Sequence, residues 1–201
     1  MADSTFRDTC CGLILAGGRA RRLGGVEKGL EPWQGHPLVA FVREALESNC
    51  TTIIVSANRR LDDYRQWADA VVRDDERFED AGPLAGLLAG MRQARTLGLQ
   101  GMLVMPCDTP GVTAAVMEQV ATAAAVDADR IVLARVEHRA HPLHGYYPVK
   151  LADDLESYLE GGERKVMGFA ERHEPLFLDL PVSADIFRNL NSPEDWSSTG
   201  L

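Results

Sequence analysis

The residues best suited to chemistry in this chain lie in one short stretch, residues 15–30, and in one isolated acidic side chain, Asp108. The stretch holds five glycines and four basic side chains in sixteen residues, and Glu27 is its single acid. Glycine lets the backbone approach a ligand closely, so several N–H groups can converge on an anion. Crowding three arginines and a lysine is costly unless negative charge arrives among them. The pattern therefore predicts a loop that wraps a nucleoside triphosphate.

Two familiar phosphate-binding motifs do not fit this loop. A P-loop requires Gly-Lys followed by Ser or Thr, but Lys28 follows Glu27 and precedes a glycine. A dinucleotide-binding fingerprint requires G-x-G-x-x-G, whereas the glycines here form doublets at 17–18 and 24–25. The remaining alternative is a flexible basic surface loop, which seldom pairs glycine doublets with four cations.

The elements that must position this loop alternate between apolar runs and helical patterns. This alternation predicts an α/β domain with a mainly parallel sheet. The predicted strands cover residues 11–15, 51–56, 70–73, 102–105, 131–136, 143–148 and 176–180. The predicted helices cover residues 38–46, 84–95, 113–125, 150–159 and 164–172, and a further helix is predicted to start at Ser192.

Candidate binding residues follow four of the predicted strands. They are the loop start at residues 15–18, then Asn58, then Asp74 and Asp75, and finally Asp108. Ligands of open parallel sheets bind beyond the carboxyl ends of the strands, so these groups are predicted to converge on one edge.

Asp108 is the best candidate for a metal ligand. Pro106 and Pro110 stiffen the segment around it. Mg²⁺ prefers hard oxygen ligands and is usually held by one or two carboxylates together with substrate phosphates. The alternative is that Asp108 only caps a turn or a helix.

Three histidines at a spacing of three residues, His138, His141 and His144, suggest a zinc site. Pro142 and Gly145 argue against a helix that would align them, and no cysteine or acidic ligand completes a set. The sequence therefore disfavours a metal site in this region.

Composition limits the remaining possibilities. The 201 residues are 45% hydrophobic and carry a formal net charge of −9, which suits one globular domain and disfavours nucleic-acid binding. No apolar stretch approaches the roughly 20 residues of a membrane span, and the N-terminus lacks a secretory layout. The four cysteines form no disulfide framework. We expect a cytoplasmic protein with no membrane association and a single domain over residues 1–201, in which residues 1–10 form a flexible tail.

The stretch from Leu15 to Leu30 resembles the signature L-A-G-G-x-x-x-R-M-G-G-x-D-K-G-L of the molybdenum cofactor guanylyltransferases. It departs from that signature at Leu23, where methionine is usual, and at Glu27, where aspartate is usual. Residues 82–86 are similar to the family element G-P-L-A-G, and residues 106–110 to P-C-D-x-P. The similarities extend to about Glu194, so they cover nearly the whole chain.

The resemblance implies the nucleotide-diphospho-sugar transferase fold, a Rossmann-like three-layer sandwich. It also implies transfer of GMP from GTP to molybdenum-bound molybdopterin, with release of diphosphate. Asp108 would hold Mg²⁺, and Lys28 and Arg22, with Arg19 or Arg21, would offset phosphate charge. The His141-Pro142 region would face the pterin. The implied nucleotide-binding residues are Leu15, Ala16, Gly17, Gly18, Lys28, Asn58, Asp74, Gly82, Pro83, Leu84 and Asp108.

The implied partners are GTP, molybdenum-molybdopterin, other proteins of molybdenum cofactor biosynthesis, and apo-molybdoenzymes or their chaperones. Two alternatives stay open. One is a cytidylyltransferase that uses CTP, or a related nucleotidyltransferase with another phosphorylated acceptor. The other is a non-catalytic GTP-binding protein that delivers the cofactor.

Overall fold

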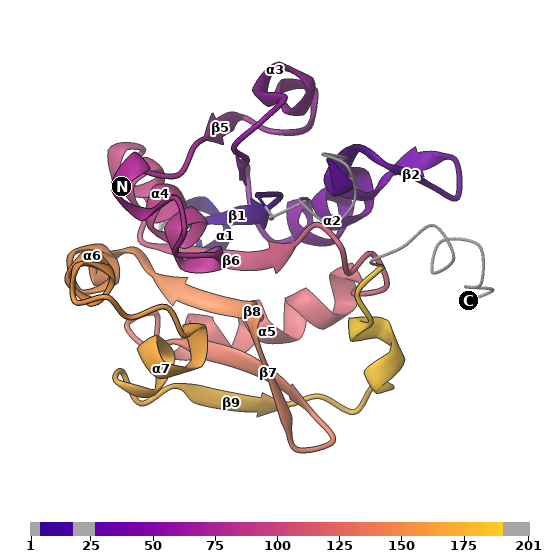
Figure 1. Cartoon of the computed structure of the whole chain (residues 1–201). Helices are drawn as coiled ribbons and strands as arrows, with labels where there is room; N and C mark the ends of the chain where they lie inside the picture. Colours follow the sequence, from indigo (N-terminus) through magenta and orange to yellow (C-terminus); the bar gives the residue numbers. More distant parts are fainter. Residues whose placement is uncertain (1–4, 18–26, 191–201) are drawn as a thin grey trace.

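The structure is a computed structural model that describes residues 5–17 and 27–190. Its centre is a seven-stranded sheet with the order β5-β4-β1-β6-β8-β7-β9 (Figure 1). The strands are β1 (Cys10–Leu15), β4 (Thr52–Ser56), β5 (Ala70–Val72), β6 (Gly101–Pro106), β7 (Val132–Val136), β8 (Arg139–Pro148) and β9 (Leu176–Asp179). A separate hairpin pairs β2 (Pro32–Trp33) with β3 (His36–Pro37).

Strands β5, β4, β1 and β6 are parallel neighbours, whereas β8 runs antiparallel to both β6 and β7. Strand β9 returns parallel to β7. The predicted α/β class with a mainly parallel sheet is therefore confirmed. Each predicted strand is present within two residues of its expected bounds, except that β8 begins four residues before the expected residue 143.

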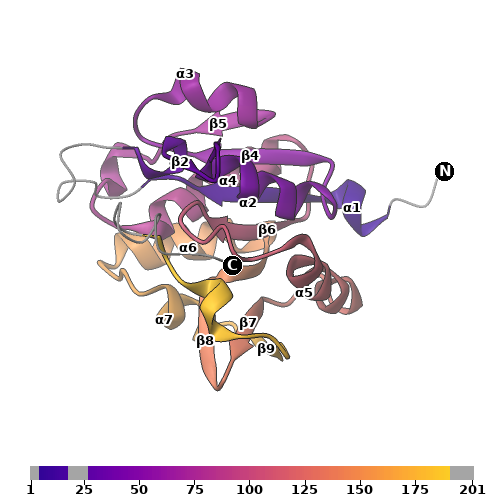
Figure 2. The ribbon, with the colours of Figure 1, turned by 90° about the vertical axis from the view of Figure 1, so that its right-hand side faces the viewer.

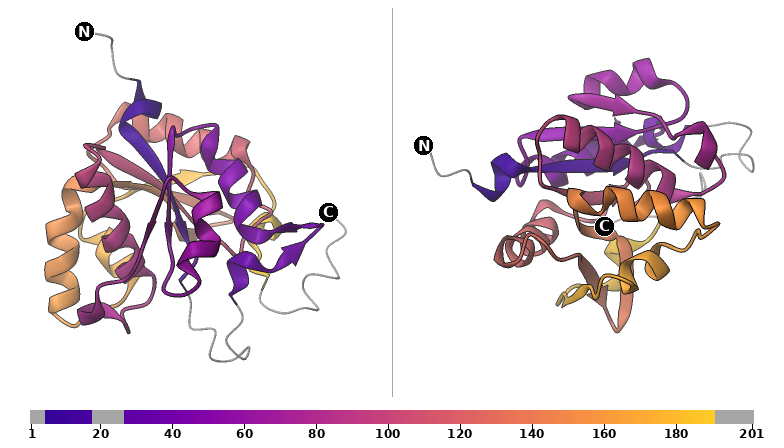
Figure 3. Two further views of the ribbon diagram at one scale, coloured as in Figure 1. Left: turned by 90° about the horizontal axis from the view of Figure 1, so that it is seen from above. Right: turned by 90° about the vertical axis from the view of Figure 1, so that its left-hand side faces the viewer.

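Helices cover both faces of the sheet and make a three-layer sandwich. Helices α2 (Leu38–Glu47) and α5 (Ala114–Val126) cover one face, which is turned to the viewer in Figure 2. Helices α4 (Pro83–Thr96), α6 (Ala152–Glu160) and α7 (Val166–Glu171) cover the other, which the right panel of Figure 3 shows. Alternate residues of β1 divide between the two cores: Ile14 packs toward α2 and Leu13 toward α4.

Shorter elements connect these layers. They are α1 (Phe6–Thr9) and α3 (Leu61–Tyr64), with the 3-10 turns η2 (Lys28–Leu30), η3 (Arg65–Trp67), η4 (Glu76–Phe78), η5 (Val149–Leu151) and η6 (Ala184–Phe187). Within the described ranges, no helix is long and apolar enough to cross a bilayer. The helix predicted to start at Ser192 lies outside the described residues.

Residues 5–10 do not form the flexible tail that was expected for residues 1–10, and residues 1–4 lie outside the described part of the chain. Helix α1 occupies part of this segment, and β1 already begins at Cys10. The Asp8 carboxylate accepts hydrogen bonds from the Thr5 backbone N–H (3.1 Å) and hydroxyl (2.7 Å), which satisfies donors at the helix start. Phe6 packs against Tyr146 with ring centroids 5.6 Å apart. The ring contact, together with the pairing of Cys10 with Gly101 on β6, attaches this segment to the domain.

Candidate active site

The carboxyl ends of the parallel strands meet as expected, and they are joined by backbone hydrogen bonds. The Ser56 carbonyl at the end of β4 accepts from the N–H groups of Ala16 (2.9 Å) and Gly17 (3.0 Å). On the other side, the Leu15 carbonyl accepts from Cys107 N–H at 3.0 Å. The N–H groups of Ala16 and Gly17 are therefore engaged by a carbonyl rather than presented to an anion. Glycine lets the backbone at residue 17 approach Asn58 closely, because a side-chain carbon at this position would lie 3.2 Å from Asn58 Nδ2.

Asn58 and Asp74 form one unit between the ends of β4 and β5. Asn58 Nδ2 donates to Asp74 Oδ2 at 2.7 Å, and Asp74 N–H donates back to Asn58 Oδ1 at 3.0 Å. The Ser56 hydroxyl donates to Asp74 Oδ1 at 3.4 Å. Burial raises the pKa of Asp74 above its usual value, and the bonds from Asn58 and Ser56 offset part of that rise. The pair presents a preorganised set of amide and carboxylate groups.

Lys28 and Asp108 come together across the gap between η2 and the end of β6. Lys28 Nζ lies 3.6 Å from Asp108 Oδ2, and both side chains are largely buried, at 24% and 18% exposure. Burial raises the pKa of Asp108, and the Lys28 ammonium lowers it by a smaller amount. The Asp108 carbonyl accepts a hydrogen bond from Leu190 N–H at 2.8 Å, which attaches the loop after β6 to the segment that follows η6. The arrangement places one cation and one carboxylate side by side, 80 residues apart in the sequence.

Gly82, Pro83 and Leu84 form the start of helix α4. Gly82 is the residue before the helix, with a positive φ of 65°, and Pro83 occupies the first turn. Leu84 is fully buried in the core, so any ligand contact there would use its backbone. A side-chain carbon at Gly86 would lie 2.7 Å from Ser56 Oγ, so glycine lets α4 approach the carboxyl end of β4.

Part of the predicted site lies outside the described residues. Gly18 and Arg22 belong to residues 18–26, as do Arg19 and Arg21. The roles expected for these four residues stay predictions.

Sequence reasoning missed one contact beside the loop. Glu27, the single acid of the basic stretch, is buried at 7% exposure, and its Oε1 lies 2.6 Å from Arg59 Nε. The position of Arg59 directly after Asn58 was the only available signal. The Glu27 side chain is buried while that of Arg59 is about half exposed, so the pair connects the residue before Lys28 to the segment after β4.

The histidines do not form a metal centre. His138 lies in the turn before β8 with a positive φ of 66°, while His141 and His144 lie on β8 with ring centroids 5.9 Å apart. Within residues 5–17 and 27–190, no three His, Cys, Asp or Glu side chains group as a metal site. Asp108 offers a hard oxygen donor at the end of β6, which fits Mg²⁺ because that ion takes one or two carboxylates and completes its shell with phosphates and water.

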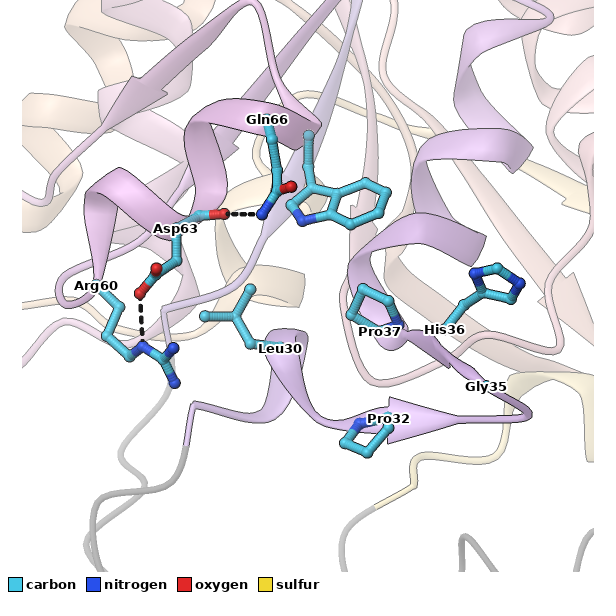
Figure 4. Close-up of a pocket in the computed structure, with 9 residues that line it drawn as sticks. Leu30, Pro32, Gly35, His36, Pro37, Arg60, Asp63 and Gln66 are labelled. Atoms are coloured by element: carbon cyan, nitrogen blue, oxygen red, sulfur yellow. Dashed lines mark hydrogen bonds and ion pairs between the residues drawn. The ribbon is translucent and has the colours of Figure 1, made fainter.

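A cavity of about 270 Å³ lies between the β2–β3 hairpin and α3 (Figure 4). Leu30, Pro32 and Pro37 form an apolar wall, and Arg60 Nε donates to Asp63 Oδ2 at 2.7 Å at its rim. None of its lining residues is a predicted site residue.

The α/β fold and the strand edge fit a nucleotidyltransferase, and the comparison with known families shows that class. The sequence matches the family described as MobA-like NTP transferase domain over residues 12–176, and the chain belongs to that family.

Curated relatives agree with this assignment, and a solved structure has a similar fold. The chain is 35% identical to a molybdenum cofactor guanylyltransferase of Ectopseudomonas mendocina over 192 residues, covering 96% of this chain and 92% of the relative. A protein of the same name from Cereibacter sphaeroides is 38% identical over 184 residues, 92% of each chain. The fold is similar to the crystal structure of molybdopterin-guanine dinucleotide biosynthesis protein A from Archaeoglobus fulgidus, with a TM-score of 0.72, 21% identity, and coverage of 93% and 95% of the two chains.

Proposed function

We propose that this chain transfers GMP from GTP to the terminal phosphate of molybdenum-bound molybdopterin and releases diphosphate. The observation that carries the proposal is the 3.6 Å contact between Lys28 Nζ and Asp108 Oδ2 at the carboxyl edge of the sheet. The similarity to molybdenum cofactor guanylyltransferases over nearly the full length supports it. On this proposal residues 1–201 act as a single nucleotidyltransferase domain.

The acceptor phosphate oxygen would attack the α-phosphorus of GTP in line with the departing diphosphate. The oxygen already carries negative charge, so the chain needs no general base, and positioning and electrostatics dominate. Lys28, together with Arg22 and Arg19 or Arg21, would offset charge on the triphosphate and the leaving group. Without these cations, two polyanions would repel each other at the moment of reaction.

Asp108 would hold Mg²⁺ through its carboxylate. Bound there, Mg²⁺ would supply a Lewis acid that neutralises phosphate charge. The Asp108–Lys28 contact keeps the carboxylate close to a positive charge in a largely buried environment. The same contact orients the carboxylate toward the place where a triphosphate would meet Lys28.

The nucleoside would lie against the other half of the edge. Asn58 and Asp74 offer amide and carboxylate groups that suit the guanine edge or the ribose hydroxyls. The start of α4 at residues 82–84 would border them, where the positive end of the helix dipole also favours negative charge. Backbone at Leu15, Ala16, Gly17 and Gly18 would contact the nucleotide from the remaining side.

Incubation with molybdenum-molybdopterin, Mg²⁺ and either GTP or CTP tests the proposal. We expect diphosphate release and a guanine dinucleotide product with GTP, and little turnover with CTP. Faster turnover with CTP would identify a cytidylyltransferase. GTP binding without diphosphate release would identify a cofactor-delivery protein. Other biosynthetic proteins and apo-molybdoenzymes or their chaperones are the partners we propose for the product.

A further inference from the structure

Strand β8 carries an irregularity beside the candidate active site. On β7, Leu133 pairs with Gly145, whereas the next residue, Ala134, pairs with His141. The three β8 residues between these two pairs are therefore looped out as a bulge, and the last of them is His144. Bulges redirect side chains and are common next to active sites.

The Tyr147 hydroxyl holds this bulge in place by donating to the Pro142 carbonyl. A side-chain carbon at Gly145 would collide with the Val132 carbonyl oxygen on β7, so the strands can approach here only because this residue is glycine. The irregular backbone is thus fixed from both sides.

The redirected His144 ring contacts the loop after β6. Its Nε2 lies 2.8 Å from Thr109 Oγ1, and both residues are buried, at 4% and 0% exposure. The Thr109 hydroxyl also lies 3.3 Å from the Pro106 carbonyl, to which it donates. With the hydroxyl hydrogen directed to Pro106, Nε2–H donates to Thr109, and this tautomer leaves no buried N–H without an acceptor. The imidazole is neutral, because burial lowers the pKa of His144 to about 3.

Thr109 directly follows Asp108, and further contacts hold the same turn. Leu190 N–H donates to the Asp108 carbonyl at 2.8 Å. Phe187, three residues earlier, packs edge-on against His144 with centroids 4.9 Å apart and stacks on His141 at 4.2 Å. Two segments distant in sequence, β8 and residues 187–190, therefore fix the same turn.

A purely structural role does not explain a polar pair in this place. His144 Nδ1 is buried without a hydrogen-bond partner in the described part of the chain, which costs stability. Replacing both partners of a buried hydrogen bond with apolar groups of the same shape can be nearly neutral for stability. What an apolar pair would not reproduce is the direction that the hydrogen bond imposes on the turn.

We infer that Thr109 and His144 are positioning residues, which hold the turn of Asp108 so that its carboxylate points toward Lys28 and could hold a divalent metal ion there. The inference rests on the proposed function. Neither residue would touch the reacting atoms. Their effect is on the orientation of the carboxylate, and a displacement of about 1 Å in such a group can lower a rate by about 100-fold.

The test compares variants that separate shape from hydrogen bonding. Thr109→Val keeps the shape and removes the hydroxyl, while Thr109→Ser keeps the hydroxyl. His144→Leu removes the ring donor, while His144→Gln retains an N–H donor at the end of the side chain. Tyr146→Phe is the matched control, because it removes a hydrogen bond of 2.9 Å from a buried tyrosine to the Ala128 carbonyl away from the site.

Two measurements are made on the full chain: steady-state kinetics with GTP and molybdenum-molybdopterin, and titration with Mn²⁺ in the presence of GTP, followed by electron paramagnetic resonance. We expect Thr109→Val and His144→Leu to lower kcat by about 10- to 100-fold and to weaken Mn²⁺ binding severalfold. KM for GTP should change by less than about threefold, because the nucleoside contacts are intact. Thr109→Ser, His144→Gln and Tyr146→Phe should resemble the wild type in both measurements.

Wild-type kcat and Mn²⁺ binding in Thr109→Val would overturn the inference, as would equal losses in Thr109→Ser or Tyr146→Phe. Absence of wild-type diphosphate release would instead reject the proposed function, and the Mn²⁺ titration would then decide the inference by itself. Weaker Mn²⁺ binding in Thr109→Val but not in Thr109→Ser would support the positioning role. Equal Mn²⁺ binding in the two variants, or no Mn²⁺ binding in the wild type, would reject that role.

Discussion

Replacing Asp108 with asparagine should change activity and stability in opposite directions. The Asp108 carboxylate lies 3.6 Å from Lys28 Nζ, and at this distance the gross Coulomb attraction between the two charges is about 5 kcal/mol for an effective dielectric constant of about 20. The pKa of Asp108 is nevertheless raised, because burial outweighs the attraction. The ionised carboxylate is thus less favourable in the folded chain than in the unfolded one, and this cost is present at pH values above its folded pKa. Asparagine resembles the protonated acid and avoids that cost.

The effect on catalysis has the opposite sign. Asparagine removes the anionic oxygen that would hold Mg²⁺, and the loss of one electrostatic contact to a transition state typically costs about 3–4 kcal/mol, or 10²- to 10³-fold in kcat. For a chain of this length, about 1 kcal/mol corresponds to 2–4 °C in Tm. We therefore expect Asp108→Asn to lose at least about 100-fold in turnover while its Tm stays equal or rises by a few degrees.

Diphosphate release with GTP and molybdenum-molybdopterin measures the first quantity, and thermal unfolding followed by circular dichroism measures the second. Asp179→Asn is the matched control. Its carboxylate accepts two bonds of 2.6 Å from Arg135, its side chain is well exposed, and its pKa is lowered by those bonds. The control should keep wild-type turnover and lose a little stability. Turnover within tenfold of the wild type in Asp108→Asn, or a drop of several degrees in its Tm, would refute the reasoning.

Three further predictions concern neighbouring groups. Lys28→Ala should lower the rate at saturating GTP by about 100-fold, because a cation that would face the phosphates is lost. Lys150→Ala removes an exposed ion pair and should keep the wild-type rate. A wild-type rate in Lys28→Ala would show that Lys28 is not part of the site. Asn58→Leu breaks the bonds of 2.7 and 3.0 Å to Asp74 and should raise KM for GTP more than it lowers kcat, which steady-state kinetics would reveal; an unchanged KM would contradict this. Because the folded pKa of His144 is about 3, its contribution to stability is complete above pH 6.5 and is lost as the pH falls. His144→Gln should therefore reduce the acid-side fall in unfolding free energy by about 3 kcal/mol between pH 6.5 and pH 4 in urea titrations, and parallel curves for variant and wild type would count against this.

The convergence of site residues was predictable because it follows from the rules of parallel sheets. Buried runs such as residues 102–105 end at a proline or polar residue, and parallel neighbours place all such ends at one edge. Asn58, Asp74 and Asp108 were located in this way. Lys28 does not follow a strand, and its place near Asp108 was expected only from the family resemblance; the structure gives the distance of 3.6 Å.

The start of β8 was not predictable from turn signals. The hairpin between β7 and β8 turns at Glu137 and His138, which have φ values of 48° and 66°. Two-residue hairpin turns with positive φ usually contain glycine or asparagine, and neither is present here. The β2–β3 hairpin was missed for another reason: each of its strands has only two residues, too few for an alternating pattern.

The Thr109–His144 contact was hidden for a third reason. Sequence reasoning considered the histidines as metal ligands and judged them by their mutual spacing. The relevant partner lies 35 residues earlier, and only the three-residue bulge turns the ring toward it. No periodicity encodes such a bulge, because it is an interruption of the alternating pattern at a single place in the strand.

The burial of every cysteine makes this enzyme convenient for site-directed spectroscopy. All four thiols, Cys10, Cys11, Cys50 and Cys107, are unpaired and inside the protein. Burial raises the pKa of Cys107 to about 12, so little reactive thiolate is present near neutral pH. A cysteine introduced at a well-exposed position such as Val126, at 87% exposure, would react selectively with a maleimide dye or nitroxide. Reporter groups can therefore be attached to the native sequence without first removing its own sulfur chemistry.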